Sequence, residues 1–184
     1  DVFIKKYLNN TLKRNEVCFT FDDGIKSQFD VALPVLNEFK IKSFFFVYSS
    51  LFTGKPDYLE VYRYFRLNFY KSINEFYFNF FKYLNFDLKN YFSENHKIII
   101  NSKYKFPHYS INDIKFRLVR DKLLNPRQYK LIMSKLFKIK RFNPKKYLNH
   151  LYINKENLKI IKNDGHIIGL HSHSHPTLIE KLSY

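Results

Sequence analysis

The sequence predicts an α/β fold with parallel strands, and three observations support this prediction. An apolar run that ends at Asp22 is followed by a helix-like segment and then by a second apolar run, all before residue 52. A third short apolar run, at 166–170, follows another helix-like segment near the end of the chain. The first and third runs both end in clusters of polar residues. Strands joined through a helix pair in parallel, with a right-handed crossover.

The first strand is expected at residues 16–22, where β-branched and aromatic residues are enriched. Residues 27–40 show the periodicity of a helix face, with apolar side chains at Phe29, Leu33, Leu36 and Phe39. Pro34 would kink this helix or mark its true start. The second strand is expected at residues 42–50, whose apolar centre is typical of a parallel strand covered on both faces.

The middle of the chain, roughly 52–150, is expected to be helical. Aromatic and aliphatic residues recur at steps of three and four through residues 62–84, which predicts one long helix or two shorter ones. These aromatics could form a stacking platform for bases or sugars. Their helical spacing favours the other interpretation, which is packing in a core.

Three further helices are indicated by their ends. One helix is expected at residues 111–124, with Asn112 as a candidate N-cap. Another is expected at residues 126–137, with Asn125 as a candidate N-cap and a proline at the first helical position. Near the end of the chain, Asn154 can cap a helix that runs to Asn163. A glycine two residues later can stop this helix before the third strand.

Length and composition limit the class of protein. The chain has 184 residues, of which 45% are hydrophobic, so it can bury the core of one domain. A single cysteine, Cys18, excludes an internal disulfide and a cysteine-based zinc cluster, and it is expected to pack inside the first strand. No apolar run is long enough to cross a membrane. No signal peptide is visible, but the chain starts at Asp1, so the compartment stays open between the cell envelope and the cytoplasm.

The net charge of +16 has two interpretations. It could attract an anionic partner such as nucleic acid, phospholipid or acidic glycan. It could also reflect a composition rich in Lys, Asn, Ile, Phe and Tyr, as an AT-rich coding sequence would give. The lysines are scattered along the chain, which favours the second interpretation, and we expect no nucleic-acid partner.

The polar residues that follow the first and third strands fit a metal site. Asp22 and Asp23 end the first strand, and His171 and His175 follow the third. The carboxyl ends of parallel strands lie on one face, so these residues should be neighbours in space. On a helical turn, the spacing of the two histidines would point both rings to one side. One carboxylate and two imidazoles suit a catalytic zinc with an open position, and the second carboxylate can act as a base.

The stretches TFDDG and DGHIIGLHSHSHP resemble the first two motifs of the NodB-homology polysaccharide deacetylases, which form carbohydrate esterase family four. The resemblance implies that Asp22 is the general base and that Asp23, His171 and His175 bind the metal. It also implies that Ser172 braces the histidine loop. The implied reaction is metal-dependent removal of acetyl groups from N-acetylated or O-acetylated sugars. The implied metal is a divalent ion, Zn²⁺ first, with Co²⁺, Ni²⁺ or Mn²⁺ as alternatives.

The same resemblance implies the N-terminal part of a distorted (β/α) barrel, with 52–150 as a largely helical insertion between the second and third strands. It covers about 16–50 and 152–184. The later motifs of the family, which supply an arginine, an oxyanion-stabilising segment and a histidine general acid, do not occur before Tyr184. We therefore expect residues 1–184 to be a single, incomplete deacetylase domain that is inactive alone.

Two other classes of function stay open on the sequence. The chain could be a non-catalytic basic module that binds anionic glycan, lipid or nucleic acid. It could also hold a purely structural metal, because such sites use four protein ligands and His173 could join Asp23, His171 and His175. The sequence does not predict the oligomeric state.

Overall fold

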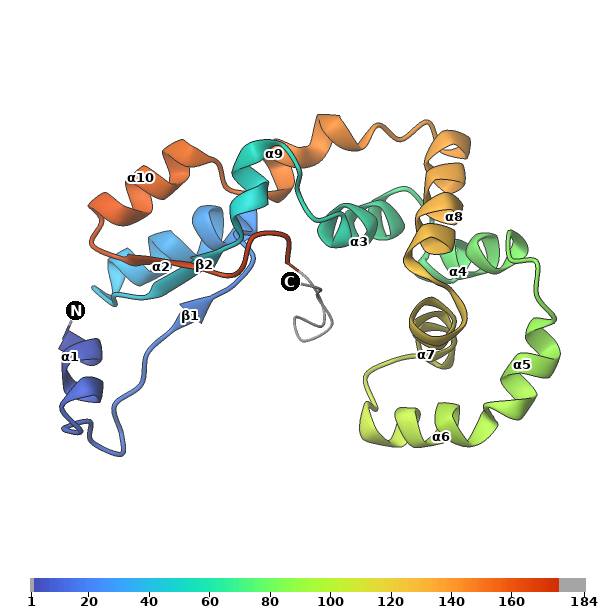
Figure 1. Ribbon diagram of the computed structural model, residues 1–184, viewed down its shortest axis with the longest axis horizontal. Coiled ribbons are helices and arrows are strands. Elements are labelled where there is room, and N and C mark those ends of the chain that lie inside the picture. The colour runs from blue at the N-terminus through green and yellow to red at the C-terminus, as the bar shows by residue number, and fades with distance from the viewer. Residues whose placement is uncertain (1, 176–184) are drawn as a thin grey trace. The chain divides into compact units, whose positions relative to one another are not determined.

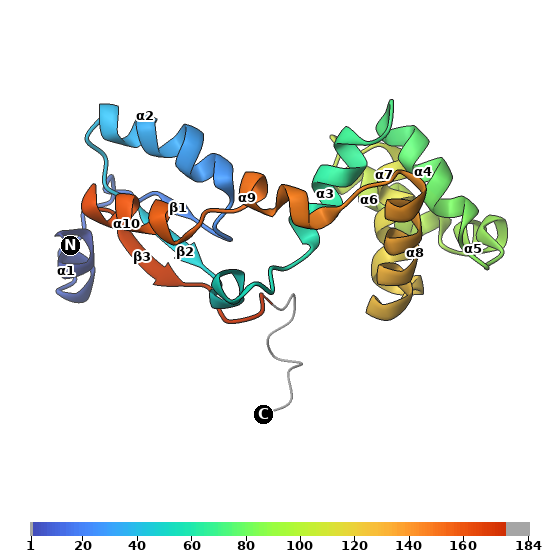
Figure 2. The same cartoon turned by 90° about the horizontal axis from the view of Figure 1, so that it is seen from above.

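The computed structural model describes residues 2–175, and the chain divides into two compact units. The first unit contains the described residues up to 61 and those from 144 onward, and the second contains residues 62–143. Figure 1 labels most of the helices and strands, and Figure 2 also labels β3. The second unit is narrower than 52–150, and the assignment of that longer range as an insertion stays a prediction.

The first unit combines helices with a small parallel sheet. Its strands are arranged in the order β1-β2-β3, and both pairings are parallel. Its elements are α1 (Val2–Leu8), β1 (Thr20–Phe21), α2 (Leu33–Glu38), β2 (Phe44–Val47), α9 (Leu148–Leu151), α10 (Lys155–Asn163) and β3 (Ile167–Leu170). A mixed chain with parallel strands agrees with the predicted α/β class. Three strands do not establish a distorted barrel.

The first strand is shorter than the predicted range of 16–22. Only Thr20 and Phe21 pair with β2, and they lie opposite Phe44 and Phe45. Because β2 itself begins at Phe44, the residues before Thr20 have no strand beside them on which to extend the ladder. The prediction that Cys18 packs inside this strand is wrong for the same reason, since Cys18 is exposed.

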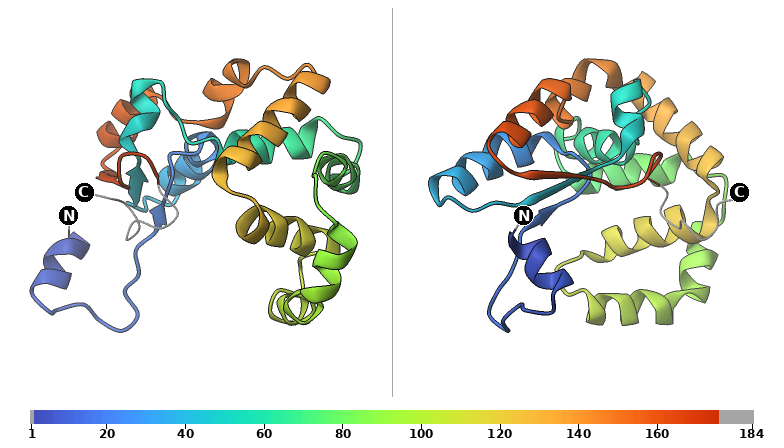
Figure 3. Two further views of the ribbon diagram at one scale, coloured as in Figure 1. Left: turned by 45° about the vertical axis from the view of Figure 1, so that its right-hand side comes forward. Right: turned by 60° about the vertical axis from the view of Figure 1, so that its left-hand side comes forward.

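The core of the first unit lies between one face of the sheet and the helices α2 and α10. Figure 2 and Figure 3 show both helices on the same side of the strands. Phe45 and Val47 supply the sheet side of this core because alternate residues of β2 point to the same face. The buried residues of this cluster are Leu33, Leu36, Phe45, Val47, Ile153 and Ile161.

Local sequence signals place α2 and α10. The segment before α2 forms a π-helical turn at Gln28–Ala32, and Pro34 lies in the first turn of α2, where a proline is tolerated. Asn154 caps α10 through a reciprocal capping box with Asn157. Gly165 follows α10 with a left-handed φ of 82°. The predicted start and stop of α10 are therefore confirmed.

The second unit is helical in its described residues. Its helices are α3 (Leu59–Asn68, which starts in the first unit), α4 (Ile73–Lys82), α5 (Leu88–Glu94), α6 (His96–Lys105), α7 (Ile111–Leu118) and α8 (Pro126–Ile139). The periodic segment 62–84 thus forms two helices, and Ser72 caps the second of them. Asn125 caps α8 as predicted. The prediction for Asn112 is wrong, because the hydroxyl of Ser110 accepts from the Asp113 N–H and caps α7 instead.

The aromatic residues of the second unit pack against one another. Phe65, Phe76 and Phe80 are fully buried, as is Phe116 on α7. The Phe116 ring lies 4.9 Å from the Phe80 ring and 5.4 Å from the Phe76 ring, centre to centre, with the edge-to-face tilt that aromatic pairs prefer. These positions support core packing over a stacking platform. No helix in residues 2–175 has the length and apolar character needed to cross a membrane.

A buried histidine joins the sheet to α2. His166 is 4% exposed, and its Nδ1 accepts a hydrogen bond from the Ser43 N–H at 3.2 Å. Its Nε2 lies 3.2 Å from Asn37 Oδ1, so the neutral ring with the proton on Nε2 satisfies both partners. Burial, assisted by the nearby Lys42 ammonium, lowers the pKa of His166. A proton on Nδ1 would face the Ser43 N–H directly.

We expect the stability of this unit to fall as the solution becomes acidic. The unfolded chain has an ordinary histidine pKa of about 6.5, above the pKa in the folded state, so it binds the proton more readily. The stabilisation that comes from keeping His166 neutral is therefore complete above the unfolded-state pKa. It is lost as the pH falls towards the folded-state pKa. The free energy of unfolding, measured between pH 7.5 and 5.5, should depend less on pH in His166→Gln than in the wild type. An unchanged slope in His166→Gln would contradict this; His96→Gln, at an exposed histidine, is the control.

Candidate metal centre

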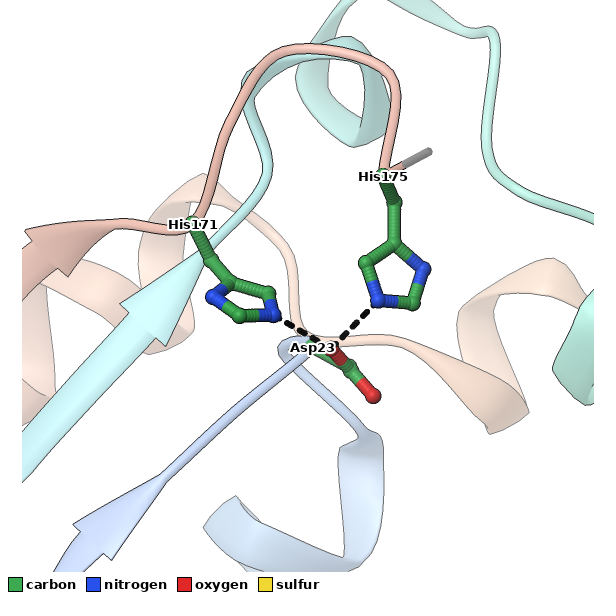
Figure 4. Close-up of side chains that lie close together, drawn as sticks. All are labelled: Asp23, His171 and His175. Atoms are coloured by element: carbon green, nitrogen blue, oxygen red, sulfur yellow. Dashed lines mark ion pairs between the residues drawn. The ribbon is translucent and has the colours of Figure 1, made fainter. Parts of the chain in front are cut away.

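Asp23, His171 and His175 converge at one point of the first unit. Asp23 Oδ1 lies 3.4 Å from His171 Nε2 and 3.0 Å from His175 Nε2. Figure 4 shows both rings directed at the same carboxylate. One ligand atom from each residue lies within 4.8 Å of the others, which is the size of a shell around a single ion.

The strand ends bring these residues together. Asp23 follows β1, and His171 follows β3 directly. The His171 N–H donates to the Val47 carbonyl at 2.8 Å, which continues the ladder between β3 and the central strand. The N–H groups of Ser49 and Ser50 then donate to the carbonyls of the histidine loop. The segment after β2 therefore holds the loop that carries both histidines.

The histidine loop is not the helical turn that the spacing suggested. Residues 171–175 are irregular, and Ser172 and His175 have left-handed φ values of 67° and 52°. Asp23 also has a left-handed φ, of 74°. Such conformations cost free energy in residues other than glycine, and they concentrate at functional sites. The two rings meet because the loop reverses its direction, and their spacing in the sequence does not by itself position them.

Gly24 fits the turn that presents Asp23. Its φ is 62°, and an added Cβ would lie 3.3 Å from the side chains of Val47, Leu51 and Ile153. Its carbonyl accepts a hydrogen bond from the Ile153 N–H at 2.9 Å. A side chain at this position would be strained by the left-handed φ and crowded by three core side chains, so glycine suits the turn, and its bond to Ile153 fixes the turn after β1 against the core.

Asp22 and Ser172 lie beside the trio. Asp22 is exposed, and within the part of the chain that the structure describes no hydrogen bond or ion pair engages its carboxylate. Its backbone carbonyl accepts from the Gln28 side chain. Ser172 Oγ accepts from the His175 N–H at 3.0 Å, which is the geometry of a brace across the loop. The roles of both residues stay predictions.

His173 does not join the trio. Its Nδ1 lies 2.8 Å from Ser49 Oγ, and its carbonyl accepts from Ser50. The group of possible ligands found among the described residues contains Asp23, His171 and His175 alone. Three ligands fit a catalytic zinc site with an open position better than they fit a structural site, which uses four.

The donor atoms present suit a divalent cation. Asp23 Oδ1 is buried and has no hydrogen-bond partner among the described residues, although two imidazole nitrogens lie close to it. A buried carboxylate oxygen without a partner is costly, and a bound cation removes that cost. The set of two imidazoles and one carboxylate oxygen matches the ligand preferences of zinc.

The sequence analysis missed three residues that surround His175. Asp57 Oδ2 lies 2.9 Å from His175 Nδ1. Tyr48, which is 1% exposed, stacks on the His175 ring with a centroid separation of 5.3 Å, and Tyr152 packs edge-on against Tyr48. Asp57 precedes a helix, so its sequence position predicts at most a cap for α3. Nothing in the spacing pairs it with a histidine 118 residues away.

The fold and the converging side chains define an α/β protein with a candidate metal centre where parallel strands end. A family model described as polysaccharide deacetylase matches residues 9–64, which include Asp22 and Asp23. The resemblance to polysaccharide deacetylases is thereby confirmed over that segment. The comparisons with curated proteins and with solved structures find no match.

Proposed function

We propose that this chain carries the metal site of a hydrolase that removes acetyl groups from N-acetylated or O-acetylated sugars. The observation that carries the proposal is the convergence of Asp23, His171 and His175 on one point. The family match supports it, because its range includes the two aspartates. The basic, non-catalytic module gains no support from any feature of the described residues beyond the net charge.

Asp23, His171 and His175 would hold the ion, with Zn²⁺ as the first choice and Co²⁺, Ni²⁺ or Mn²⁺ as alternatives. Such an ion supplies Lewis-acid stabilisation of charge on the acetyl oxygen and lowers the pKa of a water molecule to about 7. The chain's own contribution is orientation. The Ser172 hydroxyl and the backbone bonds from the segment after β2 fix the loop, so the two Nε2 atoms face Asp23.

Asp22 would act as the general base. Its neighbour Asp23 is engaged by the histidines, whereas the exposed Asp22 carboxylate is free to accept a proton from the attacking water. The protonation of the leaving nitrogen or oxygen has no assigned residue among those described. His173, the nearest other imidazole, is engaged by Ser49.

Acetate release from N-acetylated chitooligosaccharides and from a simple acetyl ester tests the proposed function. The full-length protein should release acetate when loaded with Zn²⁺ or Co²⁺, and a chelator should abolish this release. If the protein binds metal but releases no acetate from these or other acetylated sugars, the metal site is real and the proposed deacetylase reaction is wrong. Equal release with and without metal would contradict the proposal.

A further inference from the structure

Asp57 contacts Nδ1 of His175, the ring nitrogen that points away from the candidate metal centre. The His175 ring lies between two carboxylates, with Nε2 3.0 Å from Asp23 Oδ1 and Nδ1 2.9 Å from Asp57 Oδ2. A neutral imidazole carries one proton, and a ligand nitrogen must be free of it. If Nε2 is to bind an ion, the proton belongs on Nδ1, where Asp57 can accept it.

The carboxylate of Asp57 is held in this orientation by the start of the helix that follows it. Asp57 Oδ1 accepts a hydrogen bond from the Leu59 N–H at 3.1 Å, at the start of α3. Since one oxygen is used by the helix terminus, the other is fixed towards His175. The two oxygens therefore have separate partners, and rotation of the carboxylate would break both contacts.

Two buried tyrosines hold the backbone of Asp57. The Asp57 N–H donates to the Tyr48 hydroxyl at 3.1 Å, and the Asp57 carbonyl accepts from the Tyr152 hydroxyl at 2.6 Å. Tyrosine hydroxyls keep their protons at neutral pH, so Tyr152 is a donor to the Asp57 carbonyl. Tyr48 stacks on His175 as well, with only 15° between the ring planes.

The packing around this group is tight. The space left between Asp23, Tyr48, Asp57 and His175 amounts to about 10 Å³, which is at the lower limit for one water molecule. With the Asp57 carboxylate in place, a water molecule therefore has little room beside it. The contact between Asp57 and His175 is direct, at part-buried positions.

We propose that Asp57 is a positioning residue, which holds the proton of His175 on Nδ1 and directs Nε2 at the metal. A carboxylate, a histidine and a metal in this order form an arrangement that orients a ligand and raises its basicity. The inference rests on the proposed metal site, but it does not depend on the substrate or on the deacetylase reaction.

Three substitutions separate this role from the capping of α3. Asp57→Ala removes both contacts. Asp57→Ser keeps an oxygen that can accept from the Leu59 N–H, as serine does in such turns, but its side chain is too short to reach His175. Asp57→Asn keeps the size of the side chain without the negative charge, but its single carbonyl oxygen can accept from only one of the two partners. Asp87→Asn, at an aspartate that caps α5, is the matched control elsewhere in the chain.

The first measurement is the affinity for Co²⁺ or Zn²⁺, obtained by competition with a chelator, together with the visible spectrum of bound Co²⁺. Asp57→Ala and Asp57→Ser should each bind the ion about 10- to 100-fold more weakly than the wild type, as for other partners of ligating histidines. Asp57→Asn should also bind the ion more weakly, because its one oxygen cannot serve both the Leu59 N–H and the proton on His175 Nδ1, and Asp87→Asn should bind like the wild type. Wild-type affinity in Asp57→Ser would overturn the inference, because the contact would then serve only the helix.

The second measurement needs no metal. The ¹⁵N chemical shifts of the His175 ring at pH 8 report which nitrogen carries the proton. The wild type should show the proton on Nδ1, and Asp57→Ala should shift the population towards Nε2. If the wild type binds no ion but shows this tautomer shift, the proposed metal site fails while Asp57 still orients His175. If the tautomer is the same in both proteins, the inference fails even if the ion binds.

Discussion

Replacing Asp23 with alanine should abolish metal binding, whereas replacing Asp22 should leave the metal bound and slow the reaction by about 10²–10⁴-fold. The structure gives the two neighbours different surroundings. Asp23 Oδ1 faces two imidazole nitrogens, while the Asp22 side chain is exposed. A ligand removed from a three-ligand set leaves too few donors. A base removed from beside the site affects only the proton transfer.

The measurement combines metal content with acetate release. Metal content is determined after dialysis of Asp22→Asn, Asp22→Ala and Asp23→Ala, and acetate release is measured with the full-length protein. Asp22→Asn keeps the size of the side chain and removes its basicity, so its rate should fall as far as that of Asp22→Ala. Loss of metal to the same extent at both positions would show that the division of roles is wrong.

The candidate site could be predicted because its position follows from strand order. Asp23 and His171 are distant in sequence, yet both follow parallel strands, and the carboxyl ends of such strands share one edge. The caps of α8 and α10 were predictable for a different reason. Asn125 and Asn154 act on backbone groups within three residues, so a short stretch of sequence contains the whole interaction.

The features that were missed depend on contacts between distant segments. The length of β1 is set by where its partner β2 begins, which the apolar run around Val17 does not reveal. Asp57 meets His175 only because the segment after β2 lies against the histidine loop. Similarly, the spacing of His171 and His175 suggested a helical turn, but left-handed residues in the loop produce the same convergence. No periodicity in the sequence encodes these contacts.

Replacing Phe45 with alanine should destabilise the first unit by about 3–5 kcal/mol, which is the usual range for deleting a buried phenylalanine. Phe45 is fully buried in the central strand. Its ring stacks on Phe21 at 5.0 Å and lies nearly perpendicular to the His166 ring at 5.4 Å, between centroids. Removal of the ring would leave a cavity in the buried cluster of the first unit.

Hydrogen exchange of the β2 and β3 amides measures this effect in the unit that contains Phe45, without assuming that the whole chain unfolds in one step. Phe39→Ala is the control, because Phe39 is 67% exposed and should change the free energy of unfolding by less than about 0.5 kcal/mol. A loss below 1 kcal/mol in Phe45→Ala would mean that the core rearranges to fill the space.

The same substitution should weaken metal binding, although Phe45 lies outside the ligand set. Phe21, which stacks on Phe45, is the last residue of β1 and directly precedes Asp22 and Asp23. Without the Phe45 ring, β1 loses its stacking contact, and the turn that presents Asp23 is held by two backbone pairs to β2 and by the bond from the Ile153 N–H to Gly24. Titration with Co²⁺ should therefore show lower affinity in Phe45→Ala and wild-type affinity in Phe39→Ala. Equal affinity in both variants would mean that Gly24, through its bond to Ile153, holds the turn without help from the strand.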